Sequence, residues 1–323
     1  MRIAVTDGID AGAKAELEKI GHSVVERYHT IGELMEGSIS DFDIVIIRSA
    51  TKLWADQIEA NTGVNGKLSM IIRAGVGVDN IDLSSASKNS VIVCNTPSAS
   101  TNAVVEITIG HLISSCRHIV RGHEKLKNGE WAKKELKGSE LRGKNLGLLG
   151  YGRIARGVAD IARSMGMNIH AYDPYVNGEV GGCTLHDSVE SLFKSCTHIS
   201  IHCFLSNETK HLVNRKMISL MPSVGDDGIE CGNHIVNCAR GGIIDENDLF
   251  EAMSSGILTS ASLDVFEVEP AIKSSLLQLE SFHATPHIGA STLEAQRRIG
   301  EEIIDIIDAH GRGEVPDSCL NKI

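Results

Sequence analysis

Arg240 stands at the end of an apolar stretch, HIVNCA (234–239), and is followed at once by Gly241 and Gly242. Such a stretch predicts a buried strand, where an arginine needs a reason to be present. An ion pair with a helix end is the ordinary explanation. A guanidinium also binds a carboxylate through two parallel hydrogen bonds, and ligands of open parallel sheets lie beyond the carboxyl ends of the strands. Arg240 is therefore predicted to bind an acidic substrate.

A candidate acid/base group lies in ATPHIGAST (284–292), where His287 ends another apolar run. A lone histidine is more often structural than catalytic. A buried carboxylate beside it would orient the ring and favour the imidazolium, which can protonate a carbonyl oxygen. The segment LDVFEVEP (263–270) offers three carboxylates, and spacing alone leaves open which one pairs with His287: Asp264, Glu267 or Glu269.

A glycine-rich turn, GYGRIA (150–155), fits the pattern G-x-G-x-x-A. Gly150 allows a tight turn, and Gly152 lets the backbone and the following helix N-terminus approach a pyrophosphate. Asp173 follows 18 residues after Ala155, at the end of the next apolar run. Its carboxylate can accept hydrogen bonds from a ribose and would repel a 2′-phosphate, which favours NAD over NADP. The alternative is a tight turn with a capping aspartate.

These residues need a scaffold, and two series of short apolar runs alternate with helical segments to provide one. Strands are expected at 2–7, 22–27, 42–50, 68–75 and 91–97, and then at 145–149, 168–174, 198–205, 234–239, 260–266 and 282–289. Helices are expected at 12–21, 55–62, 98–131, 245–256 and 291–313. This alternation predicts an α/β fold of two Rossmann-like or flavodoxin-like domains, with parallel sheets covered by helices on both faces.

Composition excludes several classes of function. A net charge of -11 without a dense Lys/Arg run argues against a nucleic-acid groove, and 4% aromatic residues argue against base-stacking platforms. No run is long enough to span a bilayer, and the N-terminal MRIAVTDG predicts a strand rather than a secretion signal. The eight cysteines form no C-x-x-C pair. Reduced core thiols in a cytoplasmic protein are expected, without disulfides or a metal site.

In series, the segments ELRGKNLGLLGYGRIA, YDP, NCARGGIIDENDL, SLDVFEVEP and PHIGASTLEAQRR resemble the D-isomer-specific 2-hydroxyacid dehydrogenase family over nearly the whole chain. The resemblance implies that Arg240 binds the substrate's carboxylate and carbonyl. It implies that His287 is the acid/base, and that Glu269 is its partner.

The resemblance also implies the remaining site residues. Those expected to bind NAD are Val76, Gly150, Gly152, Arg153, Ile154, Asp173, His202, Cys203, Cys238, Ala239, Asp264, Gly289 and Ala290. Those expected to bind substrate are Arg48, Ser49, Lys52, Arg73, Ala74 and Gly75, together with Arg240 and His287. The segments RSATK (48–52) and RAGVGVDNID (73–82) are similar to those of members whose substrate carries a phosphate. An exposed loop is the alternative for Arg48 and Lys52.

The expected reaction is NAD-dependent oxidation of 3-phospho-D-glycerate to 3-phosphohydroxypyruvate, which begins the phosphorylated route to serine. A glyoxylate or hydroxypyruvate reductase, or another D-2-hydroxyacid dehydrogenase, is the alternative. A non-catalytic NAD(H)-sensing scaffold is a more remote one. The resemblance implies a substrate-binding domain of residues 1–97 and 289–323 and an NAD-binding domain of residues 98–288, with the active site in the cleft between them and a homodimer as the assembly.

Three features depart from the family's pattern. Phe204 occupies a position where the family usually has proline, and Ala155 replaces the third glycine. The loop SVGDDGIECGN (223–233) is longer than usual. The additional regulatory domain of long family members is expected to be lacking, and with it feedback by serine.

Overall fold

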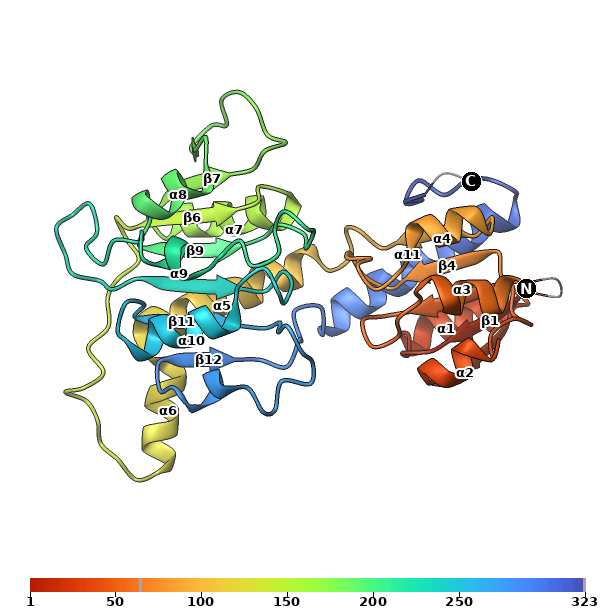
Figure 1. The fold of residues 1–323 in the computed structure, drawn as a ribbon, viewed down its shortest axis with the longest axis horizontal. Coiled ribbons are helices and arrows are strands. Elements are labelled where there is room, and N and C mark those ends of the chain that lie inside the picture. Colours follow the sequence, from red (N-terminus) through yellow and green to blue (C-terminus); the bar gives the residue numbers. More distant parts are fainter. Residues whose placement is uncertain (64–65, 322–323) are drawn as a thin grey trace. The chain divides into compact units, whose positions relative to one another are not determined.

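The structure, a computed structural model, describes residues 1–63 and 66–321. It divides into two compact units (Figure 1): unit 1 is Met1–Ser100 with Ala290–Ile323, and unit 2 is Thr101–Gly289. The boundaries fall three residues and one residue later than the expected ones at 97/98 and 288/289. The second segment of the substrate-binding domain is expected to end at residue 323, which lies outside the described residues.

Unit 1 is built on a five-stranded parallel sheet in the order β2-β1-β3-β4-β5. Its strands are β1 (Arg2–Val5), β2 (Ser23–Glu26), β3 (Ile44–Ile47), β4 (Met70–Arg73) and β5 (Ile92–Asn95). Its helices are α1 (Ala11–Lys19), α2 (Ile31–Met35), α3 (Ala55–Thr62), α4 (Leu83–Lys88) and α11 (Leu293–Gly311).

Alternate residues of each strand enter two separate cores, which explains why the runs are apolar throughout. In β3, Ile44 and Ile46 pack with α1 and α11, whereas Val45 and Ile47 pack with α2, α3 and α4. All four side chains are fully buried. Helices therefore cover both faces of the sheet.

Unit 2 is built on a seven-stranded sheet in the order β12-β11-β10-β9-β6-β7-β8. Its strands are β6 (Asn145–Leu149), β7 (Asn168–Tyr172), β8 (Thr184–Leu185), β9 (His198–Ile201), β10 (His234–Asn237), β11 (Ser260–Leu263) and β12 (Phe282–Ala284). Its helices are α5 (Thr101–Arg117), α6 (Ile119–Lys127), α7 (Arg153–Ser164), α8 (Val189–Ser195), α9 (Arg215–Ile218), α10 (Glu246–Ser254) and the 3-10 turn η1 (Ser275–Gln278).

Both faces of this sheet are buried too. Leu146 and Leu148 pack with α5 and α7, whereas Ile199 and Ile201 pack with α8, α9 and α10. All pairings in both sheets are parallel. The predicted α/β fold with two parallel sheets is confirmed, and among the strands of the described residues only the short edge strand β8 was not predicted.

The single helix expected over residues 98–131 is wrong. The chain bends by 65° between α5 and α6, where His118 adopts the left-handed conformation with φ 52°. Beyond the bend the N–H of Ser139 binds the carbonyl of Cys116, which holds the returning chain against the end of α5. In residues 1–63 and 66–321 no single helix is long and apolar enough to cross a membrane, and α5 and α6 meet that criterion only as a bent pair.

The long loop 223–233 is fixed to the start of β6. Lys144, only 2% exposed, forms an ion pair with Asp227, and the amide of Asn145 donates to Asp226 at 2.9 Å. The ion pair lowers the pKa of Asp227, as does the N–H of Ile229. The loop thus supplies the counter-charge for a buried lysine.

Candidate active site

The strand order of unit 2 reverses at β6, because the chain continues from β6 to β7 on one side and places β9 on the other. Crevices at such reversals bind ligands in open parallel sheets. Gly150 ends β6 there with φ 91°, and a β-carbon on it would lie 2.7 Å from the backbone nitrogen of Cys203. Only glycine fits this turn.

The entrance to α7 is open. Gly152 is its N-cap, and no heavy atom lies within 4 Å of the place where a β-carbon would project. Arg153 and Ile154 begin the helix. The first N–H groups of a helix have no carbonyl partner within the helix and are available to a ligand. This open cradle fits the pyrophosphate of a dinucleotide.

Asp173, just after β7, holds the glycine turn together. Its two carboxylate oxygens accept the N–H of Tyr151 at 2.8 Å and the N–H of Tyr175 at 2.9 Å. The capping role that the sequence allowed is therefore present. Each carboxylate oxygen has a second lone pair, so the side chain can also accept a ribose hydroxyl.

Two exposed aromatic rings lie beside this turn. Tyr175 is 77% exposed and Phe204 is 60% exposed, and their rings face each other with centroids 6.5 Å apart and an interplanar angle of 24°. Phe204, in the position of the family's proline, thus forms part of an aromatic surface near Asp173.

Three titratable side chains just after β9 and β10 are uncharged at neutral pH: His202, Cys203 and Cys238. Burial lowers the pKa of His202 to about 3, and its Nε2 contacts the hydroxyl of Ser200 at 2.8 Å. Burial raises the pKa of Cys203 to about 11 and that of Cys238 to about 12. Thiols of this kind are unreactive. All eight cysteines are free.

Arg240 leaves β10 in a loop held by its own backbone. The amide of Asn237 donates to the carbonyl of Arg240 at 2.8 Å, and the guanidinium donates to the carbonyl of Ala239 at 2.7 Å. Gly241 follows in a place where a β-carbon would lie 1.8 Å from the carbonyl oxygen of Phe266. The Arg240 loop is therefore packed directly against the segment that leads to Glu269.

His287 and Glu269 are joined by a hydrogen bond of 2.8 Å between Nδ1 and Oε2, with side chains 30% and 35% exposed. Burial acts to raise the pKa of Glu269, but the hydrogen bond and charge of His287 outweigh it. The N–H of Phe266 and the charge of Arg240 add to this effect, so the pKa of Glu269 lies below its ordinary value. Among the contacts of the described residues, the His287 ring is hydrogen-bonded through Nδ1 and not through Nε2.

The other two carboxylates have different partners. Glu267 lies 3.1 Å from Nε2 of His211 and accepts the N–H of Glu246. Asp264 accepts the N–H groups of Ile288 and Gly289, both at 2.8 Å. Of the three candidates that spacing left open, Glu269 is the one that contacts the His287 ring.

In unit 1, the expected substrate residues gather at the carboxyl edge of β3 and β4, which pair with each other. Asp7 organises the first of them, since its carboxylate accepts the N–H of Arg48 at 2.7 Å and the N–H of Thr51 at 3.0 Å. Burial lowers the pKa of Arg48, opposed by the charge of Asp7. Ser49 and Lys52 are exposed.

Arg73 ends β4, and its guanidinium donates to the carbonyl of Ala74 at 3.1 Å. Gly75, with φ 144°, makes room for it, because a β-carbon there would overlap the guanidinium. The side-chain amide of Asn95 donates to the carbonyl oxygen of Val76 at 2.6 Å. Asp7 and Asn95 anchor these loops through contacts distant in sequence, which local sequence patterns do not reveal. Ala290 begins the second segment of unit 1, next to Gly289 in unit 2.

Among the described residues, one group could hold a metal by residue type and spacing: Cys116, His198 and His234, all buried. Protein contacts already occupy the four ring nitrogens. His198 contacts Thr197 and Cys116 at 2.8 and 3.2 Å, and His234 contacts Ser260 and the carbonyl of Cys231 at 2.7 and 3.0 Å. The cluster is thus satisfied without an ion.

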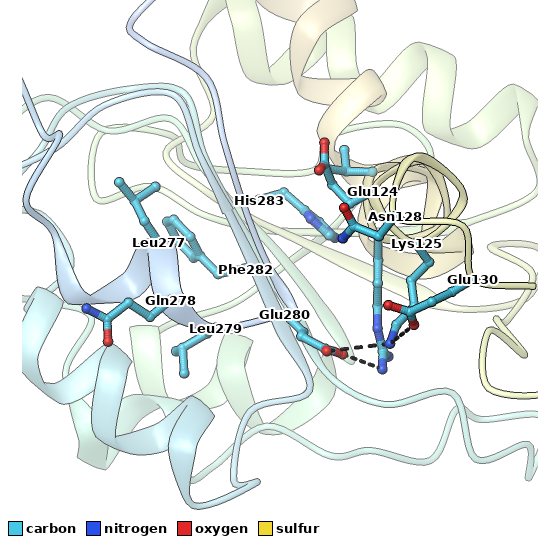
Figure 2. Close-up of a pocket in the computed structure, with 12 residues that line it drawn as sticks. Glu124, Lys125, Asn128, Glu130, Leu277, Gln278, Leu279, Glu280, Phe282 and His283 are labelled. Carbon is cyan, nitrogen blue, oxygen red and sulfur yellow. Dashed lines mark hydrogen bonds and ion pairs between the residues drawn. The ribbon is translucent and has the colours of Figure 1, made fainter. Parts of the chain in front are cut away.

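A cavity of about 300 Å³ lies between α6 and the segment 277–283 (Figure 2). Glu280 closes one side through ion pairs with Arg121 at 2.7 Å and Lys125 at 3.7 Å. None of the expected site residues lines it. The chemistry of the strand ends is therefore separate from this cavity.

Residues 109–289 match the family described as D-isomer specific 2-hydroxyacid dehydrogenase, NAD binding domain. The chain is 42% identical to D-3-phosphoglycerate dehydrogenase of Methanocaldococcus jannaschii over 99% of its length, but spans only 59% of that relative. It is 44% identical to hydroxypyruvate reductase of Thermotoga maritima over 95% of its length and 97% of that relative.

A solved structure of NAD+-bound 3-phosphoglycerate dehydrogenase from Entamoeba histolytica is 32% identical to the chain, with a TM-score of 0.81, covering 100% of this chain and 99% of that one. The glycine turn and the open entrance to α7 fit a dinucleotide, and the similarity to the relatives extends over nearly the whole chain. The chain belongs to the D-isomer specific 2-hydroxyacid dehydrogenase family, and its cofactor is NAD.

Proposed function

We propose that the protein oxidises 3-phospho-D-glycerate to 3-phosphohydroxypyruvate with NAD, or runs this reaction in reverse, as the first step of serine synthesis. The observation that carries the chemistry is the hydrogen bond between His287 and Glu269, 2.8 Å long, with the charge of Arg240 acting on Glu269. An oriented imidazole beside a cation suits proton transfer at a hydroxyl next to a carboxylate.

NAD, when bound, supplies the hydride acceptor. Gly150, Gly152 and the first residues of α7 would hold its pyrophosphate, because the turn is tight and the helix entrance is open. Asp173 would accept the ribose hydroxyls, with Tyr175 and Phe204 beside the adenine. The family resemblance adds His202, Cys203, Cys238, Ala239, Asp264 and Gly289 to this proposal, together with Val76 and Ala290.

The protein's own groups would then act as follows. Arg240 binds the substrate carboxylate, and the free ring nitrogen of His287 takes the proton of the 2-hydroxyl. Glu269 accepts the Nδ1–H of His287 and stabilises the imidazolium that forms. In reduction, the same imidazolium returns its proton to the carbonyl oxygen, since acid and base exchange roles in the reverse direction.

We assign the substrate phosphate to Arg48 and Lys52, with Arg73, Ser49, Ala74 and Gly75 beside them. Support comes from the position of Arg48 and Arg73 at neighbouring strand ends and from Asp7, which fixes the Arg48 backbone. Arginine is well suited to phosphate because its donors match the oxygens in pairs.

Hydroxypyruvate reductase is the second candidate. The Thermotoga maritima relative with that name is similar to the chain over 97% of its own length, whereas only 59% of the archaeal phosphoglycerate dehydrogenase is matched. Both reactions would use the same acid/base pair, so the phosphate-binding residues distinguish them.

The deciding experiment compares kcat/KM for phosphohydroxypyruvate, hydroxypyruvate and glyoxylate with NADH, followed at the nicotinamide absorption band. A preference for the phosphorylated 2-oxoacid by at least about 100-fold is expected, the value of one to two charge-assisted contacts. A preference for hydroxypyruvate or glyoxylate would favour the second candidate. NADH binding without turnover of any of the three would favour a sensing scaffold.

We further propose a homodimer in the cytoplasm. The exposed apolar side chains of α6 and its surroundings support the dimer: Ile119, Val120, Leu126 and Trp131 are 54%, 42%, 58% and 81% exposed. The free cysteines support a reducing compartment. Sedimentation of the wild type and of Trp131→Ser tests the assembly.

A further inference from the structure

A chain of hydrogen bonds runs from the middle of α5 to the loop that carries His287. It begins at His111, a buried side chain whose Nε2 lies 2.9 Å from the hydroxyl oxygen of Thr285, at the end of β12. The Thr285 hydroxyl donates to Oδ1 of Asp264 at 2.6 Å. His111 and Thr285 are 174 positions apart in sequence.

The direction of each bond follows from proton counting. The Thr285 hydroxyl has one proton and gives it to Asp264, so it can only accept from His111. Burial lowers the pKa of His111, opposed by the charge of Asp264, and the neighbouring His283 has its own pKa lowered to about 4. The His111 ring is therefore neutral with its proton on Nε2.

The carboxylate of Asp264, which accepts the Thr285 hydroxyl, also binds the loop that carries His287. It accepts the N–H of Ile288 and the N–H of Gly289, both at 2.8 Å. A β-carbon on Gly289 would lie 3.0 Å from Oδ2, so glycine allows this close approach. Between these anchors and Thr285 lies His287, held at φ 54°, a left-handed conformation that residues other than glycine rarely adopt.

We propose that His111 is a positioning residue for His287, acting through Thr285 and Asp264. The proposal rests on the proposed role of His287 in proton transfer. A donor at Nε2 of His111 fixes the Thr285 hydroxyl toward Asp264 and leaves the carboxylate oriented toward the two loop N–H groups. His287 then keeps its left-handed backbone and its 2.8 Å bond to Glu269.

A neighbouring contact provides the comparison. One turn further along α5, the hydroxyl of Ser115 contacts the hydroxyl of Ser262 at 2.7 Å, also between the helix and the sheet. Ser262 lies within β11, and among the described residues its hydroxyl is hydrogen-bonded to Ser115 and not to the loop that carries His287. If His111 only attached α5 to the sheet, removal of the His111–Thr285 contact and removal of the Ser115–Ser262 contact would affect the His287 loop equally.

The test uses the full-length protein with three variants: His111→Leu removes the donor, His111→Gln restores an N–H donor at a similar reach, and Ser115→Ala removes the neighbouring contact. Hydrogen–deuterium exchange of the Ile288 and Gly289 amides is measured without substrate. Turnover is followed as kcat and KM for the reduction of phosphohydroxypyruvate and of hydroxypyruvate by NADH.

In His111→Leu we expect amide exchange at both positions to rise about tenfold and kcat to fall about 10- to 100-fold, with KM nearly unchanged. His111→Gln should restore most of each change, and Ser115→Ala should show none.

Equal exchange in His111→Leu and Ser115→Ala, or failure of His111→Gln to restore it, would overturn the positioning role. If exchange responds as expected while the wild type turns over neither substrate, the positioning of the loop is supported and the proposed reaction fails. The two conclusions are thereby separated.

Discussion

The carbonyl oxygen of Phe266 lies 1.8 Å from the point where Gly241 would carry a β-carbon. Two backbone segments thus meet without a side chain between them: the loop that follows β10 and carries Arg240, and the loop that follows β11 and leads to Glu269. This contact explains why a glycine follows the arginine directly.

Gly241→Ala should therefore separate the two loops. The obstacle is backbone rather than a flexible side chain, so we expect a loss of several kcal/mol in unfolding free energy and a large loss of kcat. Urea unfolding and steady-state kinetics provide the measurement. Gly110→Ala, in an open position on α5, is the control and should be neutral or slightly stabilising. Equal behaviour of the two variants would show that the close contact is unimportant.

His287→Ala should abolish turnover while NADH binding stays within about threefold of the wild type, since the ring contacts Glu269 and not the glycine turn. Glu269→Gln keeps the shape but replaces the charged partner, and kcat should fall about 100-fold or more. Fluorescence titration with NADH and turnover assays check both. Simultaneous loss of binding and turnover in His287→Ala would contradict a specific chemical role.

Arg48→Ala should raise KM for phosphohydroxypyruvate about 10- to 100-fold, the value of a charge-assisted contact, and change KM for hydroxypyruvate little. Arg2→Ala is the control: it removes an exposed arginine at the start of β1, and its KM values should match the wild type. An equal rise for both substrates in Arg48→Ala would argue against a phosphate contact.

Phe204→Leu should weaken NADH binding about fivefold, because stacking of a base on an aromatic ring contributes about 1 kcal/mol or more. Reduced nicotinamide mononucleotide, which has no adenine, should bind the variant and the wild type equally. Tyr28→Leu removes an exposed ring of unit 1 and serves as control. If both ligands lose affinity in Phe204→Leu, the aromatic pair does not face the adenine.

Unit 2 should lose stability as the pH falls from 6.5 toward 4. Burial lowers the pKa of His202 to about 3 and that of His234 and His283 to about 4, so the unfolded chain takes up protons that the folded chain does not. Stability therefore rises with pH over this window. The loss should be about 2 kcal/mol per histidine at pH 5.

His283→Phe removes one such group whose Nδ1, among the described residues, is buried without a hydrogen-bond partner. The urea midpoint, followed by circular dichroism at pH 7.5 and pH 5, should fall less in this variant than in the wild type. The exposed His123→Phe is the matched control for the substitution itself. An unaltered pH dependence in His283→Phe would refute this assignment.

The sequence by itself determined the fold class and the cofactor, because both depend on local patterns. Runs of β-branched residues separated by helical segments predict parallel sheets, and the glycine turn at 150–152 follows a strand and begins a helix within a few residues. The strand ends also pointed to Arg240 and His287, since every strand of a parallel sheet directs its carboxyl end to the same edge.

Only the tertiary structure decided relationships between distant residues. Spacing could not choose among three carboxylates, and the contact with His287 depends on how the loops after β11 and β12 fold back. The break between α5 and α6 at His118 could not be predicted, because the residues around it are compatible with a continuous helix. The contact of the Ser139 N–H with the carbonyl of Cys116, at the end of α5, joins residues distant in sequence. His111 has the pattern of a core histidine on an apolar helix face. Its link to His287 exists because α5 crosses the sheet where β12 ends, and long-range packing of this kind leaves no periodic signal in the sequence.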